Sequence, residues 1–288
     1  MEILREFWKS ILIGASLLFL FGSYYFYINF SNINNLRISF LDVGQGDAIF
    51  IETKDRKQIL IDGGPNNEVL KGLAKNMAFF DRKIDLVIAT HPDADHITGL
   101  ISVLQKYNVE KILISNVSAK TGIFDSFNDE ILRRDISDIY IGNLGDEIIL
   151  GDGITFKIIY PLSESVRGGD TNANSIVSLL SYGDHSFLLT GDLPETGENR
   201  IISYLPRNIT LLKAAHHGSN TSSSNIFLNY LKPFYTIISA GKDNRYGHPH
   251  AEVMERLSKN SKSILNTIED GTITFVSNGR DLRIETEK

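Results

Sequence analysis

The chain has 288 residues, no cysteine and a net charge of −6 from 29 basic and 35 acidic side chains. The absence of cysteine excludes disulfides, thiolate zinc ligands and cysteine nucleophiles. The acidic surplus argues against tight, extended nucleic-acid binding, which usually needs a basic surface, but it leaves nuclease chemistry open because bound metal ions can hold a phosphate themselves.

The first feature in chain order is an apolar segment near the N-terminus. The 20 residues from Ile11 to Phe30 carry no charge, which is enough to cross a hydrocarbon core of about 30 Å as a helix. Arg5 and Lys9 precede the segment, so the positive-inside bias predicts a cytoplasmic N-terminus and an extracytoplasmic domain. A cleaved signal peptide and a buried core helix are the alternatives. The length of the segment and the lack of a small-x-small cleavage site favour an uncleaved, single-pass anchor in the cell membrane.

The rest of the chain alternates short apolar runs, typical of strands, with amphipathic stretches, typical of helices. A largely apolar strand is expected over Ile84–Thr90, and a helix is expected over Gly99–Tyr107. The hairpin turn of the later strands falls at Tyr182-Gly183-Asp184. No linker rich in Pro, Gly or Ser divides the region. We therefore expect an anchor over residues 1–35 and one α+β domain over residues 36–288, with two sheets face to face and helices outside, an αββα four-layer sandwich.

The strongest chemical signal is the segment ATHPDADHITGL, which follows the apolar strand. Four residues of metal-ligand type lie within it, namely His91, Asp93, Asp95 and His96. Alternate residues leaving a strand point the same way, and a tight loop can add the adjacent pair, so one short loop can hold two ions. A polar loop in which Asp95 caps the next helix is the alternative. The density of histidine and aspartate favours the metal site.

This segment resembles the metallo-β-lactamase superfamily signature His-x-His-x-Asp-His, with Asp93 in place of the second histidine. That variant is similar to the C-terminal domain of the ComEC family of competence proteins. Further family-like motifs follow in order along Ser39–Val276, namely FLDVGQGDAIFI, ILIDGG, NANSIVSLL, LLTGD, LKAAHHGS and ISAGKDNRYGHPH. Thr98-Gly99 stands where Gly-Gly is common. The resemblance implies a stand-alone metallo-β-lactamase fold, with one anchor in place of the family's polytopic channel.

The resemblance also implies the residues of a two-metal site. The implied ligands are His91, Asp93 and Asp192 at one ion, and Asp95, His96 and His217 with the bridging Asp192 at the other. His216 and His217 end the same apolar strand, and the ligand role stays open between them; the other ring then contacts the substrate. The implied catalytic residues are Asp95, His216 and His248, the last as a general acid or oxyanion stabiliser.

Four further residues are implied as supports of the metal ligands or the substrate: Asp47, Asp62, Asn174 and Ser219. Asp47 is expected beside the metal loop, in contact with a ligand or the substrate. Asp62 is expected to orient a ligating histidine, with a simple turn aspartate as the alternative. Asn174 stands where other members carry a third metal-binding histidine. An amide in that place is expected to make one metal site bind more weakly or prefer a harder metal ion. Ser219 is expected to donate to a phosphate oxygen.

Four more polar residues are weighed for the rim of the site. His250 is expected to begin a helix rather than to act in the reaction, and Lys213 is expected to be a solvated lysine. Lys242 and Arg245 are candidates for positive charge at the rim.

The predicted function is metal-dependent hydrolysis of a phosphodiester, with DNA as the expected substrate in a competence-related role. Two divalent ions would activate a water between them. The Asp93 carboxylate hardens the site and tilts it toward manganese, with zinc equally open. The alternatives are a surface esterase of phosphorylcholine type and a DNA-uptake accessory or binding module with an inert metal site. The substitutions at Asp93 and Asn174 disfavour a β-lactamase.

Overall fold

The structure, a computed structural model, describes residues 1–31, 35–151, 153–162 and 170–288. In that part of the chain the strands form two sheets. The first contains, in sheet order, β15 (Leu282–Thr286), β14 (Ile273–Ser277), β1 (Leu36–Phe40), β2 (Ile49–Glu52), β3 (Gln58–Ile61), β4 (Lys83–Ala89), β5 (Asn108–Ile114) and β6 (Ile139–Ile141). The second contains β13 (Ser263–Asn266), β12 (Tyr235–Ile238), β11 (Leu211–Lys213), β10 (His185–Leu189), β9 (Val177–Tyr182), β8 (Ile154–Tyr160) and β7 (Glu147–Ile149).

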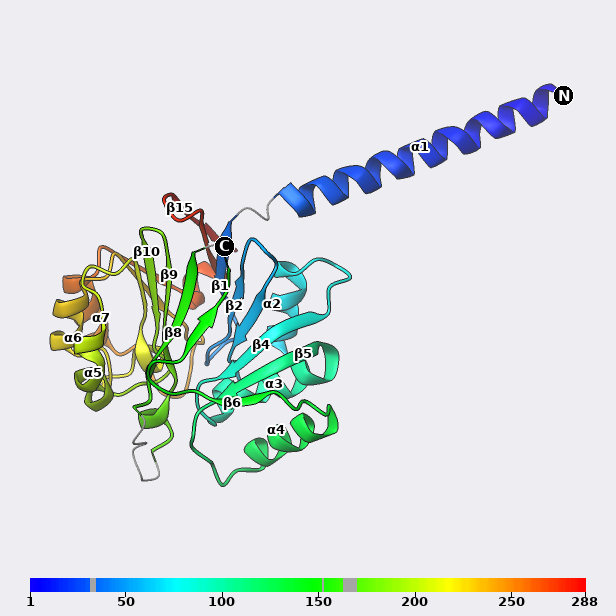
Figure 1. Ribbon diagram of the computed structural model, residues 1–288. Helices are drawn as coiled ribbons and strands as arrows, with labels where there is room; N and C mark the ends of the chain where they lie inside the picture. The colour runs from blue at the N-terminus through cyan, green and yellow to red at the C-terminus, as the bar shows by residue number, and fades with distance from the viewer. Residues whose placement is uncertain (32–34, 152, 163–169) are drawn as a thin grey trace.

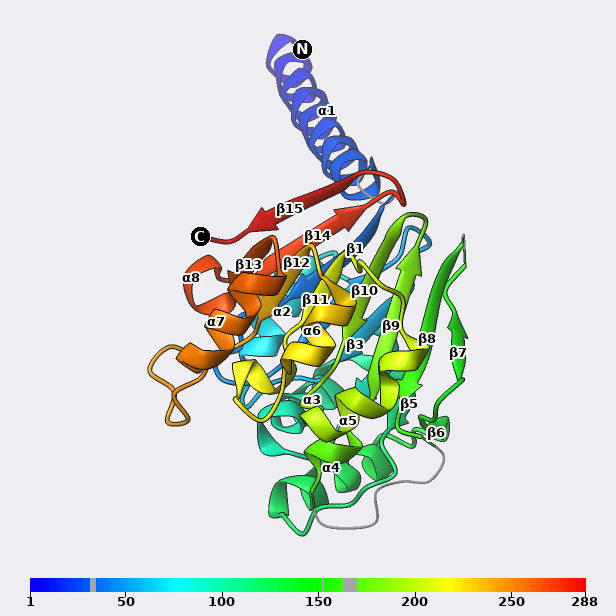
Figure 2. The same cartoon turned by 90° about the vertical axis from the view of Figure 1, so that its left-hand side faces the viewer.

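Helices precede the sandwich and cover both of its outer faces (Figures 1 and 2). The α-helices are α1 (Glu2–Ser31), α2 (Glu68–Asn76), α3 (Ala94–Lys106), α4 (Gly122–Arg133), α5 (Glu195–Ile201), α6 (Asn225–Leu231), α7 (Ala251–Asn260) and α8 (Thr267–Asp270). Short 3-10 turns are η2 (Asn172–Asn174), η3 (Ile202–Tyr204) and η4 (Ala215–Gly218).

Three apolar clusters fill the layers. The central one joins the inner faces of both sheets, with Phe40 from the first sheet and Phe187 from the second. A second cluster lies between the first sheet and α2, α3 and α4, and a third lies between the second sheet and α5, α6 and α7. Because each sheet is buried on both faces, its strands are apolar along most of their length rather than alternating. These layers confirm the predicted αββα sandwich.

The two ends of the sandwich carry different features. β1 and β2 are antiparallel, β2 and β3 are antiparallel, and β3 and β4 are parallel, so β1, β3 and β4 run in one direction. The chain passes from α1 into the beginning of β1, and we call this the anchor end (Figure 1). Asp62 and His91 come after the last residues of β3 and β4. They lie at the opposite end, which we call the site end.

The N-terminal helix is long and apolar enough to cross a membrane. The stretch of α1 that meets both criteria is Leu4–Tyr25, with 22 residues and no part of it buried in the protein. The predicted span, Ile11–Phe30, overlaps this stretch but begins later, and the side chains of residues 26–30 lie outside the described residues. The apolar helix is thus confirmed, and the side of the membrane on which the domain lies stays a prediction.

One predicted boundary is wrong at the most informative place. We expected a loop through His96 and a helix from Gly99, but α3 begins at Ala94. Asp93 takes the N-cap position with an extended backbone (φ −75°, ψ 149°), so the loop that leaves β4 is very short. Asp95 and His96 are therefore held in the first turn of a helix. The predicted hairpin is confirmed, with Tyr182 paired to His185 across the turn.

Candidate metal centre

Strand ends from both sheets bring the site together. In the first sheet, His91 follows β4 and His96 lies in the first turn of α3. In the second sheet, Asp192 follows β10 and His217 follows β11, and these two strands are parallel neighbours. Residues at the carboxyl ends of parallel strands share one edge of a sheet, where α/β folds place their ligands.

The backbone of η4 sets the direction of two neighbouring imidazole rings. His216 and His217 have positive φ values of 52° and 54°, a left-handed conformation that is rare for residues with a side chain. The His216 amide donates to the Gly191 carbonyl at 3.2 Å, which ties this turn to the loop that carries Asp192. Strain of this kind persists where surrounding contacts hold it, and it is common at functional sites.

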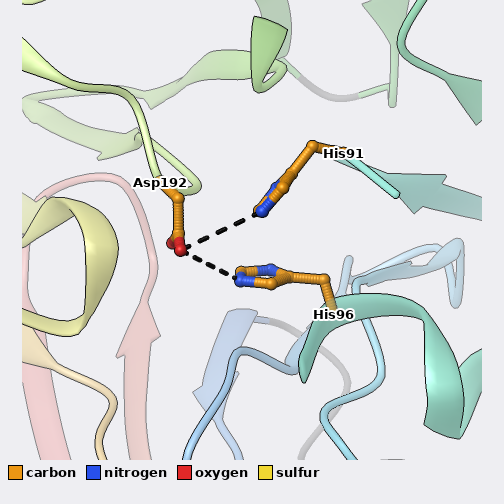
Figure 3. Close-up of side chains that lie close together, drawn as sticks. All are labelled: His91, His96 and Asp192. Atoms are coloured by element: carbon orange, nitrogen blue, oxygen red, sulfur yellow. Dashed lines mark ion pairs between the residues drawn. The ribbon is translucent and has the colours of Figure 1, made fainter. Parts of the chain in front are cut away.

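A single carboxylate oxygen lies at the centre of four imidazole rings. Asp192 Oδ2 lies 3.3 Å from His96 Nε2 and 3.4 Å from His217 Nε2. The same oxygen lies 3.7 Å from His216 Nε2 and 4.0 Å from His91 Nε2. Figure 3 shows the rings of His91 and His96 pointing toward Asp192, which approaches them from a different part of the chain. A carboxylate in this position is suited to bridge two ions.

The atoms that converge here have the properties of metal ligands. Among the described residues, no hydrogen-bond partner serves Asp192 Oδ1 or the buried Nε2 atoms of His91, His96 and His217. Each such atom costs about 1–3 kcal/mol when it is left unpaired. Four triads of the described residues offer ligand atoms within 4.8 Å of one another, and two of them are built from predicted ligands, namely His91, His96 and Asp192, and Asp95, His96 and His217. Imidazole and carboxylate donors of this kind fit a divalent ion.

The charges in the cluster reinforce one another. Burial is the largest single influence and opposes the charged forms of His96 and His217. The Asp192 carboxylate, together with Asp62 at His96 and Asp47 at His217, outweighs it and raises the pKa of both rings well above the usual value. Burial likewise acts to raise the pKa of Asp192, yet His217 and His96 hold it well below its usual range. Burial, with the neighbouring charge of His96, lowers the pKa of His91 to about 4. The central carboxyl is therefore ionised, which is the form that binds a metal.

Asp62 orients one of the candidate ligands. Its Oδ2 atom lies 2.7 Å from His96 Nδ1 and also accepts a hydrogen bond from Thr90 Oγ1 at 2.6 Å. Its Oδ1 atom accepts the Thr90 backbone N–H at 2.8 Å. With Nδ1 occupied in this way, His96 presents Nε2 to the cluster.

The buried lysine beneath the site corrects the sequence-based prediction. Lys213 was expected to be solvated, but its side chain is fully buried and pairs with Asp47 Oδ2. Asp47 Oδ1 in turn lies 3.4 Å from His217 Nδ1, beside the Ser239 carbonyl at 2.9 Å from that nitrogen. Burial acts to raise the pKa of Asp47, but Lys213 and His217 lower it to about 2. The pattern LKAAHH gave no sign of a partner so far away in sequence.

Two predicted carboxylates lie close to the cluster with contacts of their own. Asp93 Oδ2 lies 3.9 Å from His91 Nε2, and its Oδ1 accepts a hydrogen bond from Thr171 Oγ1 at 2.6 Å. Asp95 Oδ2 lies 3.5 Å from His217 Nε2. Thr171 was missed by the sequence analysis, because a lone threonine carries no motif. The ligand roles of these carboxylates stay predictions.

The remaining predicted residues divide between rim and scaffold. Asn174 is buried and its amide donates to the Asp170 carbonyl at 3.0 Å, while Ser219 Oγ contacts Thr221 Oγ1 at 3.0 Å. His248 lies with its ring 5.4 Å from that of His216. Burial and the neighbouring histidines lower the pKa of His248 to about 4.

The rim carries the exposed basic residues and one helix start. His250 precedes the first residue of α7, as predicted for a residue that begins a helix. Lys242 and Arg245 are exposed in the loop after β12.

The comparison with protein families now decides the assignment. A model described as the metallo-beta-lactamase superfamily matches residues 41–242, a range that contains Asp192 and the four histidines around it but not His248. The chain belongs to the metallo-β-lactamase superfamily. As a member of that superfamily it has the fold of a metal-dependent hydrolase, and its His/Asp cluster is placed to hold divalent metal.

Curated relatives of this metallo-β-lactamase chain carry competence-related names. It is 30% identical over 259 residues to ComE operon protein 3 of Bacillus subtilis (strain 168), covering 83% of this chain and 32% of that protein. It is 28% identical over 247 residues to competence protein ComA of Neisseria gonorrhoeae, covering 84% of this chain and 32% of that protein. The chain thus spans about a third of the length of these relatives. The predicted likeness to the ComEC family is confirmed.

Solved structures agree on the fold. The diiron β-hydroxylase CmlA from Streptomyces venezuelae superposes with a TM-score of 0.53 at 13% identity, covering 83% of this chain and 53% of that chain. At this identity the likeness concerns the fold alone.

Proposed function

We propose that this protein is a membrane-anchored phosphodiesterase that cleaves DNA in a competence-related role. The observation that carries the proposal is the position of Asp192 Oδ2 among four imidazole Nε2 atoms, because a shared carboxylate at such a centre suits a pair of ions rather than one. The names of the relatives, ComE operon protein 3 and competence protein ComA, support DNA as the substrate.

In this proposal residues 36–288 form the hydrolase domain and residues 1–35 form the anchor. Six side chains would hold two divalent ions, manganese or zinc: His91, Asp93, Asp95, His96, Asp192 and His217. When bound, the ions supply a hydroxide near neutral pH and positive charge for the phosphoryl oxygens. His91, His96, Asp192 and His217 are buried, whereas Asp93 and Asp95 are partly exposed, so substrate would reach the ions from the side of these two carboxylates.

The residues of the rim would bind and orient the phosphodiester. His216 is 26% exposed and keeps its Nδ1 atom against Thr221 Oγ1 at 3.2 Å, so its Nε2 edge faces the cluster. His248 Nδ1 is buried with no hydrogen-bond partner among the described residues, which leaves it available to a substrate oxygen. Ser219, between these rings in sequence, would donate to a second phosphate oxygen.

The proposal is tested on the purified full chain in detergent. Labelled DNA and bis-p-nitrophenyl phosphate are incubated with manganese or with zinc, and the metal content of the protein is measured in parallel. We expect metal-dependent cleavage that a chelator abolishes and that Asp95→Asn removes without unfolding the domain. Metal binding without cleavage of either substrate would refute the phosphodiesterase and favour the inert binding module. Cleavage of phosphorylcholine esters but not DNA would favour the surface esterase.

The orientation of the anchor is a separate proposal. Arg5 and Lys9 lie at the N-terminal end of α1, before the charge-free segment Ile11–Phe30, which supports a cytoplasmic N-terminus and an extracytoplasmic domain. Protease added to intact cells should digest the domain, and protection of the domain until the cells are lysed would show the opposite orientation.

A further inference from the structure

The end of the sandwich opposite the metal centre carries features that neither the fold nor the proposed hydrolysis explains. We propose that this anchor end is a docking surface for anionic lipid headgroups, so that the domain rests on the bilayer with its metal centre facing away. The inference rests on the membrane anchor of the proposed function, but it does not depend on the reaction.

The connection to the anchor is short. The stretch of α1 that could cross a membrane ends at Tyr25, six residues or about 9 Å before the end of the helix at Ser31. β1 begins at Leu36, five residues further on and at most about 18 Å away in an extended chain. Because β1 enters the sandwich at the anchor end, this end is held beside the bilayer whatever the tilt of α1. Surface chemistry at the anchor end is therefore exposed to headgroups at high effective concentration.

Two exposed aromatic rings lie at this end in the first sheet layer. Phe79 and Phe80 connect α2 to β4, with exposed fractions of 69% and 85% and ring centroids 4.8 Å apart. Arg82 Nη1 donates to the carbonyls of Phe79 and Asp81 at 3.1 and 2.6 Å, which holds the loop in shape. An adjacent pair of exposed rings beside a basic residue is typical of surfaces that enter the membrane interface.

The register of the first sheet places this pair near the anchor. In the sheet, Glu52 of β2 pairs with Arg37 of β1 on one side and with Gln58 of β3 on the other. The backbone N–H of Gln58 donates to the side chain of Asp85 in β4 at 2.8 Å. The beginnings of β1 and β4 therefore lie on one row, three strand spacings or about 14 Å apart. The Phe79–Phe80 loop directly precedes β4 and faces the same side.

The second sheet contributes a basic cavity at the same end. Its volume is about 470 Å³, and it is lined by residues just before β11, β12 and β13 and by α6 and α7, including Lys232, Phe234, Lys259 and Lys262. Lys262 Nζ lies 4.8 Å from the centroid of the Phe234 ring, which is 44% exposed. Lys259 pairs with Glu255, whereas no carboxylate pairs with Lys232 or Lys262 in the described part of the chain. An acidic protein thus concentrates unpaired ammonium groups and an aromatic ring where headgroup phosphates would lie.

A single-stranded nucleic acid also has the chemistry to bind lysines and an exposed ring. The position of the cavity favours lipid. From Lys83 to His91 the chain advances eight residues, or about 26 Å, so a strand bound at the anchor end would lie far from the metal centre. The net charge of −6 also disfavours an extended nucleic-acid path between the two ends.

The test uses the full chain in vesicles and the absence of native cysteine. A fluorophore is attached to Asn229→Cys, exposed at the cavity, or to Lys120→Cys, exposed in the loop after β5 at the site end. A lipid with a headgroup spin label serves as quencher, in phosphatidylcholine with and without phosphatidylglycerol. We expect quenching at position 229 that grows with phosphatidylglycerol, and little at position 120.

Variants then identify the contacts. Lys232→Glu/Lys262→Glu should reduce the ratio of docked to undocked protein by at least about fivefold for each charge. Phe79→Ser/Phe80→Ser should reduce quenching in both lipid mixtures. Lys120→Glu in the Asn229→Cys protein is the control and should leave the quenching unchanged in both mixtures. Equal quenching at positions 229 and 120, or insensitivity to both double variants, would overturn docking. So would a signal at position 229 that an oligonucleotide changes in the absence of vesicles.

Flotation of the protein with the vesicles separates the two levels of the argument. A chain that fails to float refutes the anchor itself. A chain that floats and cleaves DNA, yet shows no quenching at position 229, refutes docking and leaves the proposed function standing.

Discussion

Asp62 decides which nitrogen of His96 faces the metal cluster. The Asp62 carboxylate accepts hydrogen bonds from both the backbone N–H and the hydroxyl of Thr90. These two bonds fix its orientation independently of the His96 ring. The ring then has Nδ1 against Asp62 and Nε2 toward Asp192. A fixed acceptor of this kind raises the basicity of the ligand and removes its freedom to rotate.

Asp62→Asn is expected to weaken metal binding by about 10–100-fold, because an amide nitrogen placed against Thr90 or His96 cannot accept their protons. Chelator competition with the purified full chain measures the affinity. Asp129→Asn, which removes an exposed carboxylate on α4, is the matched control and should bind metal as the parent does. An unchanged affinity in Asp62→Asn would show that His96 does not need this support.

Lys213 is a second residue whose role follows from its surroundings. It is the cation that compensates Asp47, and Asp47 lies against His217 on the side away from the cluster. Breaking a buried ion pair by removing one partner leaves a charge without compensation, whereas removing both is far less costly.

Lys213→Met is therefore expected to lower the free energy of unfolding of the metal-free protein by about 3–5 kcal/mol. The double variant Lys213→Met/Asp47→Asn should recover part of that loss, because no unpaired charge stays buried. Urea unfolding of both proteins and the parent checks the order. If Asp47→Asn lowered the free energy of unfolding by the same amount in the Lys213→Met protein as in the parent, Lys213 and Asp47 would not be energetically coupled.

At the scale of elements, the position of α3 controls two of the candidate ligands. Gly99 of α3 packs against the loop after β3 so closely that no larger residue fits there. A Cβ on Gly99 would lie 1.9 Å from the Gly63 carbonyl oxygen and 2.6 Å from that of Asn66. The Gly99 amide also donates to the Gly64 carbonyl at 2.9 Å. The first turn of α3, with Asp95 and His96, is thus held by direct backbone contact.

Gly99→Ala should push α3 away from this loop, destabilise the domain by about 1–3 kcal/mol and weaken metal binding. Gly122→Ala is the matched control, because that glycine begins α4 and no atom lies within 4 Å of its added methyl group. Thermal unfolding and chelator competition are measured for both. Equal behaviour of the two variants would mean that α3 tolerates the shift.

The elements also show how far the sequence could predict this structure. Apolar strands of four to seven residues, bounded by turns, were visible as patterns because burial on both faces makes them continuous. The start of α3 was not, because Pro92 and Asp93 are equally typical of a loop and of a helix N-terminus. The strand β13 was also not predicted, because its four residues SILN are all half-buried and show no alternation of apolar and polar side chains.

The candidate ligands were predictable for a different reason. His91 to His96 are contiguous, so their chemistry appears as one local pattern. The pairing of Lys213 with Asp47 joins distant parts of the chain, and the contact of Asp93 with Thr171 does the same. These partners meet only in the folded sandwich, and no local sequence motif around Lys213 or Thr171 indicates such a contact.

At the scale of the whole molecule, parallel strands place every candidate ligand at one end and the anchor at the other. The loops after β4, β10 and β11 carry His91, Asp192 and His217 at the site end, and the loop after β3 carries Asp62 beside them. β1 receives α1 at the anchor end (Figure 1). The metal centre is thus separated from the anchor end by about the distance from Lys83 to His91 along the strand direction, or roughly 26 Å. With the proposed anchor and docking, the site end faces substrates in the aqueous space above the bilayer rather than in it.

This geometry predicts which phosphodiesters the protein can reach. In vesicles, the full chain with metal should cleave soluble DNA, while it releases headgroups from its own bilayer no faster than the metal-free protein does. A short-chain phospholipid dissolved as monomers is the control, because it offers the same ester without the geometric restriction. Phosphorus NMR of the lipids and gel analysis of the DNA measure the products. Metal-dependent headgroup release from intact vesicles would show that the domain tips over and brings the site end to the membrane. Cleavage of the monomeric lipid, with the bilayer left intact, would show that position rather than chemistry protects the membrane from the enzyme that it anchors.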